Sequence, residues 1–338
     1  MTPEELKSQL AAEAARINRV MEKDLEKVTN PRLAAVLQHA LLAGGKRIRP
    51  LLTLLAAHLV QGPEPEQKTA AAPASWNQLA IAFEYLHTAS LLHDDVIDHA
   101  DRRRGRETVN TRWDNASAIL AGDFLHARAL LLAGRAGGVT CLELIGTATQ
   151  AMVSSEFIQQ EAATSHDWRE ETYFAVLDGK TAALIAAACE AGAAAAGGSH
   201  NQRRAVRTYG ANLGLAFQII DDLLDYQGEP GTTGKAVGND LQEGKMTLPL
   251  IVARQQATAQ NMQDMKELDD ILAAEPQQRL DRLPRVRQLL EQTDALAICR
   301  QRAEELIAAG DRALEIFPAS GRRRLLGALG QYVLKRQN

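Results

Sequence analysis

Leu91-Leu-His-Asp-Asp-Val-Ile-Asp98 and Ile219-Ile-Asp-Asp-Leu-Leu-Asp225 are the two stretches that decide how this chain of 338 residues folds. Each places the pattern Asp-Asp-x-x-Asp after an apolar run, and Asp221 follows Asp94 by 127 residues. On a helix, residues four apart differ by roughly 40° of rotation and about 6 Å of rise, so the first and last aspartates of each stretch project together. Stacked like charges mildly destabilise a helix. The repeat therefore indicates two helices whose carboxylates bind cations.

The repetition also decides between the alternatives for these carboxylates. A single Asp-Asp-x-x-Asp is more often a solvated helix end, but two copies, each followed by Lys or Arg, argue against that interpretation. Carboxylates suit Mg²⁺, which takes one or two of them and completes its octahedron with phosphate oxygens and water. Zinc is the alternative because His93 and His99 flank the first cluster. Ile220 and Tyr226 take those places in the second cluster, so magnesium is favoured.

Outside these stretches the chain predicts helices and almost no strands. Apolar residues make up 46% of the sequence and recur at spacings of three and four, with few aromatic residues. The predicted helices cover residues 4–28, 31–43, 47–60, 77–97, 112–134, 140–163, 168–191, 202–226 and 246–256, and several more follow between about 260 and 337. No shift in composition marks a second domain. We therefore expect an all-α protein with a single domain over residues 1–338, built as one large helical bundle.

Charge and cysteine content exclude several classes of protein. A net charge of −4 gives no reason to expect nucleic acid as the partner, so an anionic substrate would be bound by local clusters of Lys and Arg. Cys141, Cys189 and Cys299 lie far apart, which is typical of a reducing, cytoplasmic location. The start of the sequence lacks the features of a signal peptide, and no run of 18 apolar residues occurs. A membrane span is therefore not expected.

Basic residues accompany both aspartate clusters. Arg102-Arg-Arg-Gly105 follows the first cluster, Gly44-Gly-Lys-Arg-Ile-Arg-Pro50 lies upstream, and Lys235 and Lys245 follow the second cluster. Arg and Lys are the side chains that bind diphosphate directly. The loop around Lys235 lacks the first Gly and the final Ser or Thr of a Walker loop, so ATP hydrolysis is not expected. His87 lies two helical turns before Asp94 on much the same face, although a buried core histidine is an equal alternative.

Taken together, these segments closely resemble the trans-polyprenyl diphosphate synthases. The match extends roughly from Leu41 to Ile251, with a terminal helix at 325–336. The resembling stretches are 44–50, 87–105, Gly122-Asp-Phe124, Gly179-Lys-Thr181, 217–226 and 234–250. The resemblance implies the isoprenoid synthase fold with a central prenyl tunnel, a homodimer, and about three Mg²⁺ ions as cofactor. It also implies a prenyltransferase that condenses isopentenyl diphosphate with an allylic diphosphate, for which farnesyl diphosphate is the expected starter.

The resemblance also assigns roles to individual residues. The expected metal ligands are Asp94 and Asp98, with Asp95 nearby, and Asp221, Asp222 and Asp225. The residues that match those holding isopentenyl diphosphate are Lys46, Arg49, His87 and Arg104. The residues that match those gripping the allylic diphosphate are Arg103, Lys180, Lys245 and Lys235, and those near the reacting carbons are Thr181 and Gln218. Catalysis would then consist of stabilising the departing diphosphate and excluding water while the isopentenyl double bond attacks the allylic cation.

The length of the product depends on the helix that carries the first cluster. In the resembling family the product grows along this helix, and large residues four or five positions before the first aspartate stop its growth. Ser90 and Ala89 stand there, roughly 6–8 Å from Asp94, and leave room for a product of about C35–C45, with octaprenyl favoured. The alternative is that they only permit tight helix packing. The residues that could instead set the floor are Tyr85, Leu86, Ala82 and His58.

Three other functions fit parts of the pattern. A short-chain synthase making farnesyl or geranylgeranyl diphosphate would share every motif except the small residues before Asp94. A class I terpene cyclase would need neither a second Asp-Asp-x-x-Asp nor the set Lys46, Arg49 and His87. A non-catalytic subunit of a heteromeric synthase would have a degraded aspartate motif, whereas both motifs are intact. The departures from the family pattern are Arg102, in place of an apolar residue, and a long segment at 61–76.

Overall fold

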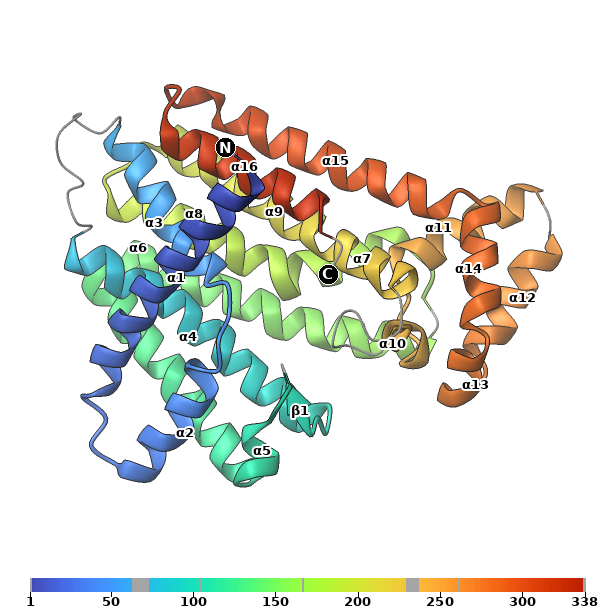
Figure 1. The fold of residues 1–338 in the computed structure, drawn as a ribbon, viewed down its shortest axis with the longest axis horizontal. Helices are drawn as coiled ribbons and strands as arrows, with labels where there is room; N and C mark the ends of the chain where they lie inside the picture. Colours follow the sequence, from blue (N-terminus) through green and yellow to red (C-terminus); the bar gives the residue numbers. More distant parts are fainter. Residues whose placement is uncertain are drawn as a thin grey trace. The chain divides into compact units, whose positions relative to one another are not determined.

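The structure, a computed structural model, describes residues 2–62, 73–103, 105–165, 167–228, 237–260 and 262–336. These residues are almost entirely helical (Figure 1), which confirms the all-α class. The chain divides into two compact units. The first unit comprises Met1–Thr149, Leu184–Gly210 and Ala313–Ala328, and the second comprises Gln150–Ala183, Ala211–Arg312 and Leu329–Asn338. The single domain over residues 1–338 stays a prediction.

Each unit is built mainly from its own helices. Those of the first unit are α1 (Pro3–Leu25), α2 (Pro31–Leu41), α3 (Ile48–Gln61), α4 (Ala74–Ile97), α5 (Val109–Arg112), most of α6 (Asn115–Ser165) and the 3₁₀ turn η2 (Leu314–Ile316). Those of the second unit are α7 (Glu170–Leu177), the π-helical turn η1 (Asp178–Ala182), α10 (Asn239–Gln242), α11 (Leu248–Gln260), α12 (Met262–Leu272), α13 (Pro276–Asp281) and α14 (Leu283–Gln292). Besides α6, the helices that contribute residues to both units are α8 (Ala183–Ala195), α9 (His200–Gln227), α15 (Ala295–Ala313) and α16 (Gly321–Leu334).

The first two helices begin where local sequence signals place their starts. Thr2 caps α1 in a reciprocal capping box with Glu5. Asn30 caps α2 by accepting the backbone N–H of Leu33, and Pro31 occupies the first helical position. These caps satisfy backbone donors that have no partner within the helix.

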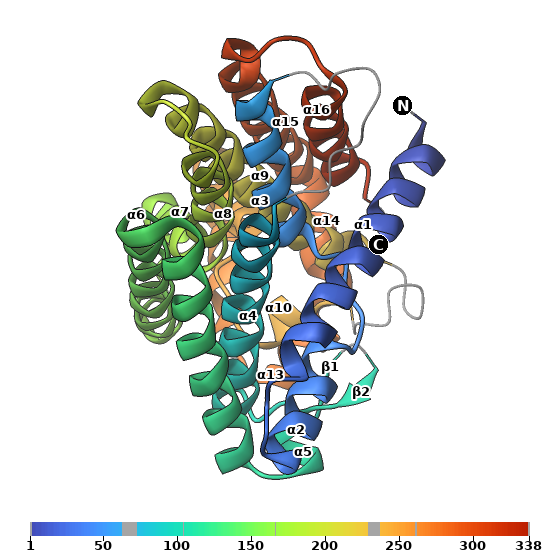
Figure 2. The same cartoon turned by 90° about the vertical axis from the view of Figure 1, so that its left-hand side faces the viewer.

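Helix α4 is the central helix of the first unit. It packs against α1, α2 and α3, and Figure 2 shows it between α1 and α6. Its contact with α6 depends on Gly122, because a Cβ at that position would lie 2.3 Å from Nε2 of His93. Most of its residues are buried along nearly the whole length, from Trp76 to Asp95. This packing fixes the end of α4, where the first aspartate cluster lies.

In the second unit, α9 carries the second cluster and packs closely on the segment that bears Lys180. A Cβ added to Gly214 of α9 would lie 2.7 Å from Cα of Ala182 in η1, so only glycine permits this approach. Helix α11 contacts α7, α12 and α14, and α10 contacts α13. The second cluster also lies next to α10, because the backbone N–H groups of Asn239 and Asp240 contact Asp225.

The two helices expected at 112–134 and 140–163 are confirmed as the two halves of α6, which non-helical backbone at Gly137 and Gly138 separates. Other elements differ in detail from the predicted ones. The helix expected at 168–191 contains the π-helical turn η1, which sequence periodicity does not reveal. Helices α5 and α10 and a two-stranded hairpin, β1 (Arg102–Arg103) and β2 (Arg106–Glu107), were not predicted, because each is too short to show a period.

One helix in the described part of the chain, α6, is long and apolar enough to cross a membrane by length and composition alone. This is weak evidence, since apolar helices of soluble proteins pass the same test. The expected lack of a membrane span stays a prediction.

Candidate active site

The first aspartate cluster lies at the C-terminal end of α4. Asp98 is the C-cap of this helix, and the backbone N–H of Ala100 donates to the carbonyl of Asp95 at 2.9 Å. His99 adopts the left-handed conformation with φ 51°, which completes the turn and ends the helix. Asp94 is half-buried and Asp98 is exposed. Two carboxylates one turn apart are therefore placed at the accessible end of the helix, as predicted.

Asp95 differs from its two neighbours because its carboxylate is already engaged. Its side chain is buried and accepts a hydrogen bond from Nε of Arg103 at 2.8 Å. Burial raises the pKa of Asp95, and the Arg103 guanidinium opposes this shift. Asp95 thus holds Arg103, a residue expected to grip the allylic diphosphate, beside the first cluster.

A cavity of the first unit collects several charged groups next to Asp95. Its lining includes Arg47, Glu84, His87, Asp95 and Arg103. His87, which could equally have been a core histidine, therefore lines a cavity together with a predicted diphosphate ligand. Further residues that line the cavity are His39, Thr88, Leu92, Arg106, Thr108 and Val109.

Lys46 and Arg49, the other residues expected to hold isopentenyl diphosphate, belong to the same unit. Lys46 is exposed in the loop before α3, and Arg49 is half-buried in the first turn of that helix. Arg104, the fourth member of that set, lies outside the described residues.

The residues expected to control product length lie on α4 at different angles from the first cluster. Ser90 lies within roughly 40° of Asp94 around the helix axis, and Tyr85 lies about 180° away from it. The hydroxyl of Tyr85 donates to Asp24 of α1 at 3.2 Å, so this ring is held on the α1 side. Ala89 and Leu86 are buried. The roles of all four in setting the product length stay predictions.

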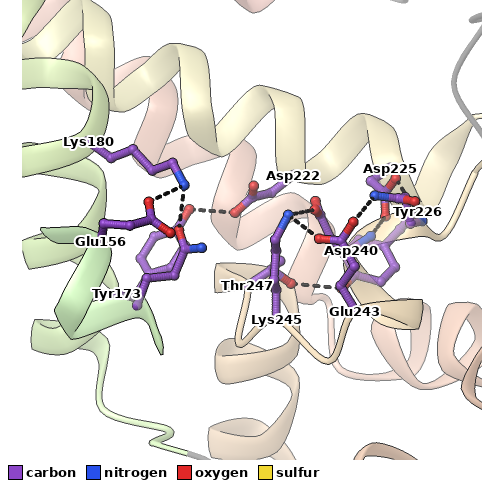
Figure 3. Close-up of polar contacts among 12 residues, drawn as sticks. Glu156, Tyr173, Lys180, Asp222, Asp225, Tyr226, Asp240, Glu243, Lys245 and Thr247 are labelled. Carbon is purple, nitrogen blue, oxygen red and sulfur yellow. Dashed lines mark hydrogen bonds and ion pairs between the residues drawn. The ribbon is translucent and has the colours of Figure 1, made fainter. Parts of the chain in front are cut away.

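The second cluster lies near the C-terminal end of α9, and its first two carboxylates have different surroundings. Asp221 is partly exposed, and Nη2 of Arg336 lies 3.3 Å from its Oδ1. Asp222 is buried and accepts a hydrogen bond from the hydroxyl of Tyr173 at 2.7 Å (Figure 3). Burial and the nearby carboxylate of Asp240 raise the pKa of Asp222 well above its usual value. Of these two side chains, Asp221 is the more accessible to a ligand.

Asp225, the last carboxylate of the second cluster, caps the short helix α10. Its two oxygens accept the backbone N–H groups of Asn239 at 3.2 Å and Asp240 at 3.0 Å. Burial, together with the carboxylate of Asp240, raises the pKa of Asp225 to about 6. Asp225 therefore orders the segment that leads to Lys245. Its predicted role as a metal ligand is not tested by these contacts.

Of the three lysines expected to grip the allylic diphosphate, Lys180 and Lys245 are each oriented by carboxylates of the second unit (Figure 3). Lys180 donates to Glu156 at 2.8 Å, and Lys245 lies 3.1 Å from Asp240 and 2.6 Å from Glu243. Burial lowers the pKa of the Lys245 ammonium, but these two carboxylates outweigh burial and raise it. Lys245 therefore stays charged at neutral pH.

Two further predicted residues lie close to this region, and one cannot be placed. Thr181 lies in η1 next to Lys180, and Gln218 lies on α9 one turn before Asp221; both are half-buried. Lys235 is outside the described residues.

Three residues that contact the predicted site were not found from the sequence. Tyr173 gives no signal, because nothing in the sequence separates it from Phe174, the aromatic residue that follows it in the same helix. Asp240 stands five residues before Lys245 in a polar segment, and that spacing could have identified it. Arg336 lies beside Asp221, with its guanidinium 4.4 Å from the centre of the Phe217 ring. Nothing in the sequence links Arg336, which lies 115 residues after Asp221, to the second cluster.

The ligand chemistry of the two clusters fits a hard divalent ion. Within the ranges that the structure describes, no three His, Cys, Asp or Glu side chains meet to form a metal site by themselves. Each cluster offers carboxylate oxygens, and Mg²⁺ typically uses one or two of these with substrate phosphates. His93, one of the two histidines that made zinc an alternative, instead lies 3.2 Å from the carbonyl of Ile119 and 3.6 Å from Asp123 on α6. Its ring therefore contacts α6.

Comparisons with known proteins show the family to which the chain belongs. A family model described as "Polyprenyl synthetase" matches residues 30–289. The chain is 36% identical over 335 residues to an all-trans-nonaprenyl-diphosphate synthase of Rhodobacter capsulatus, covering 98% of each protein. It is 36% identical over 293 residues to octaprenyl diphosphate synthase of Escherichia coli, covering 87% of this chain and 86% of that protein.

A solved structure shows the same fold. The polyprenyl synthase of Caulobacter crescentus, crystallised with calcium and isoprenyl diphosphate, superposes with a TM-score of 0.84 at 34% identity and covers 100% of this chain and 98% of the other. This confirms the expected isoprenoid synthase fold and the resemblance from which it was expected. By its matched residues, its relatives and its fold, this chain belongs to the polyprenyl synthetase family.

Proposed function

We propose that this prenyltransferase condenses isopentenyl diphosphate with an allylic diphosphate and makes an all-trans polyprenyl diphosphate of medium to long chain, with octaprenyl favoured. The observation that carries the proposal is the pair of intact aspartate clusters, each at the end of a long helix and each beside oriented cations. The small residues Ala89 and Ser90 and the names of the nonaprenyl and octaprenyl relatives support the long product. Farnesyl diphosphate is the proposed starter.

Magnesium is the proposed cofactor. Asp94 and Asp98 on α4 and Asp221 on α9 would hold it, since their carboxylates are the more accessible ones of the two clusters. When bound, Mg²⁺ supplies positive charge to the leaving diphosphate. The related polyprenyl synthase of Caulobacter crescentus was crystallised with calcium, a divalent ion, and with isoprenyl diphosphate. This supports the proposal of a divalent ion.

The chain's own cations would bind and orient the two substrates. Arg103, Lys180 and Lys245 are each held by carboxylates, so they are ordered before the allylic diphosphate arrives. Lys46, Arg49 and His87 would hold isopentenyl diphosphate. The allylic C–O bond then breaks with its electron pair leaving on the diphosphate, the isopentenyl double bond forms the new C–C bond, and a proton is lost to the released diphosphate. No protein nucleophile is needed.

The test is incubation of the purified full chain with Mg²⁺, farnesyl diphosphate and labelled isopentenyl diphosphate. We expect labelled polyprenyl diphosphate, whose chain length is measured by mass spectrometry after dephosphorylation. Chelation of the metal with EDTA should stop the reaction. A hydrocarbon product would indicate a cyclase, and no incorporation with farnesyl, geranyl or dimethylallyl diphosphate would overturn the proposal. A farnesyl or geranylgeranyl product would correct the chain length alone.

We also propose that the protein is a homodimer in the cytoplasm. The part of α6 in the first unit exposes five large apolar side chains, namely Ile119, Leu120, Leu131, Val139 and Leu142. A second copy of the chain could cover them. The three cysteines are free and buried, as is typical of a reducing compartment.

A further inference from the structure

The loop that carries Lys46 has a backbone conformation that its sequence alone does not favour. Gly44 and Gly45 have φ values of 93° and 139°, which glycine adopts without strain. Arg47, however, is also left-handed, with φ 50° and ψ 40°, at the N-cap of α3. A residue with a Cβ enters this region only at a cost. Contacts of the Arg47 side chain must therefore maintain the conformation.

The Arg47 side chain makes three contacts with three different helices. Its Nη1 donates to Oε1 of Glu84 on α4 at 2.6 Å, and its Nε donates to Oδ1 of Asn18 on α1 at 2.9 Å. Its Nη2 donates to the backbone carbonyl of Leu41, the last residue of α2. The side chains of Arg47 and Glu84 are only 2% and 6% exposed. One buried guanidinium therefore joins the loop to α1, α2 and α4.

The residues on either side of this ion pair are those proposed to hold isopentenyl diphosphate. Lys46 directly precedes Arg47, and Arg49 follows it by two residues. On α4, His87 follows Glu84 by three residues, so both lie on nearly the same side of the helix. Arg47, Glu84 and His87 all line the cavity that also contains Arg103. The ion pair thus forms part of the wall of this cavity.

Stability alone does not account for such a pair. A buried ion pair pays a large desolvation cost, and well-packed apolar residues of similar volume often stabilise a fold equally well or better. What the pair does provide is a fixed geometry, because the planar fork of arginine fixes both the distance and the angle between the groups that it joins. Since Glu84 neutralises Arg47, the pair adds little net charge for a diphosphate.

We propose that the Arg47–Glu84 ion pair is a positioning device for the isopentenyl diphosphate site, which holds Lys46 and Arg49 on the loop at a fixed distance from His87 on α4. The inference rests on the proposed function. In this inference Arg47 and Glu84 do not contact the reacting atoms themselves. Loss of the pair should therefore weaken the binding of isopentenyl diphosphate without changing the allylic site or the chemical step.

Three variants of the full chain test the proposal. The double variant Arg47→Met/Glu84→Leu replaces the pair by apolar side chains and leaves no buried charge behind. Arg47→Lys keeps the charge but loses the fork. The matched control is Glu190→Gln, which removes a half-buried carboxylate of the same unit that accepts from Arg203 at 2.9 Å and from Arg207 at 3.0 Å, away from the cavity.

The readouts are KM for isopentenyl diphosphate, KM for farnesyl diphosphate, kcat and the Kd of isopentenyl diphosphate by calorimetry. We expect the double variant to raise KM and Kd for isopentenyl diphosphate by about tenfold to a hundredfold, since small displacements of binding groups have effects of this size. Arg47→Lys should give a smaller rise. KM for farnesyl diphosphate and kcat should stay within about threefold in both variants, and Glu190→Gln should change neither KM.

Several outcomes would overturn the inference. One is an unchanged KM and Kd for isopentenyl diphosphate in a folded double variant. Another is a double variant in which KM rises equally for both substrates and kcat falls as well, which would indicate general damage to the fold. If the double variant does not fold, KM and Kd for isopentenyl diphosphate in Arg47→Lys test the inference by the same criteria. A wild-type chain that binds isopentenyl diphosphate but does not turn it over would contradict the proposed function alone, and the Kd comparison would still test the ion pair.

Discussion

At the scale of the residue, the six aspartates of the two clusters are not equivalent. Asp95 is bonded to Arg103, Asp222 to Tyr173, and Asp225 to the backbone of α10. The sequence identifies all six from their repeated spacing, but it cannot separate ligands from supports. The reason is physical: Tyr173 lies 49 residues before Asp222, so the contact depends on how α7 packs against α9.

Removal of the Tyr173 hydroxyl tests whether a supporting contact matters to catalysis. In Tyr173→Phe the buried carboxylate of Asp222 loses a hydrogen bond, which should lower the free energy of unfolding by about 1–3 kcal/mol. We also expect turnover to fall about tenfold, because Asp222 is adjacent to Asp221. Urea unfolding and a steady-state assay measure the two effects.

The control for this variant is Tyr209→Phe, which removes another buried hydroxyl, one that donates to the carbonyl of Leu326 at 2.8 Å. It should lose stability and keep its activity. If both tyrosine variants retain full turnover, the contact between Tyr173 and Asp222 serves the fold alone.

At the scale of the element, apolar periodicity predicted most of the long helices, and α2 begins as expected at Pro31, directly after its cap Asn30. Periodicity could not predict η1, because a π-turn leaves the apolar pattern unchanged. The break at Gly137 and Gly138, in contrast, falls between the two helices predicted at 112–134 and 140–163. The hairpin β1–β2 holds only two residue pairs, which is too few for a period of two to appear.

The turn η1 offers a direct test of how closely two elements must approach. A Cβ on Gly179 would lie 2.6 Å from Cβ of Ser155 and 2.7 Å from the carbonyl of Ala151, so Gly179→Ala must push η1 away from α6. Lys180 and Thr181 would move with it, and we expect turnover to fall at least about tenfold. Thermal unfolding and turnover are the measurements.

A matched alanine substitution separates crowding from helix propensity. Gly146 lies within α6, and an added Cβ there would meet no atom within 4 Å. Gly146→Ala should keep full activity and gain up to about 1 kcal/mol of stability. Equal turnover in the two alanine variants would show that the close contact at Gly179 does not position Lys180.

Helix α4 also carries the prediction about product length. Ala89 is buried five residues before Asp94, so a phenylalanine there would fill space along the helix that bears the first cluster. Ala89→Phe should shift the product toward farnesyl or geranylgeranyl diphosphate, as measured by mass spectrometry. An unchanged product length would show that Ala89 does not form the floor of the tunnel, and deeper residues would then be the candidates.

At the scale of the whole molecule, the exposed apolar face of α6 predicts self-association. Leu120 and Val139 are 65% and 70% exposed, which is costly for large apolar side chains in water. Light scattering should give twice the mass of one chain for the wild type and a monomer for Leu120→Asp/Val139→Asp. Ile316→Asp is the control, since this residue is 53% exposed on η2. A monomeric wild type, or a double variant that stays dimeric, would contradict the proposed interface.

The most direct test of the whole account is turnover in variants of each aspartate cluster. Asp94→Asn and Asp221→Asn each keep the size of the side chain and remove one carboxylate. With Mg²⁺, farnesyl diphosphate and labelled isopentenyl diphosphate, we predict that each lowers kcat by about a thousandfold or more. Asp281→Asn, which removes an exposed carboxylate of α13, should leave kcat unchanged. Near-normal kcat in either the Asp94 or the Asp221 variant would contradict the claim that both clusters act in prenyl transfer.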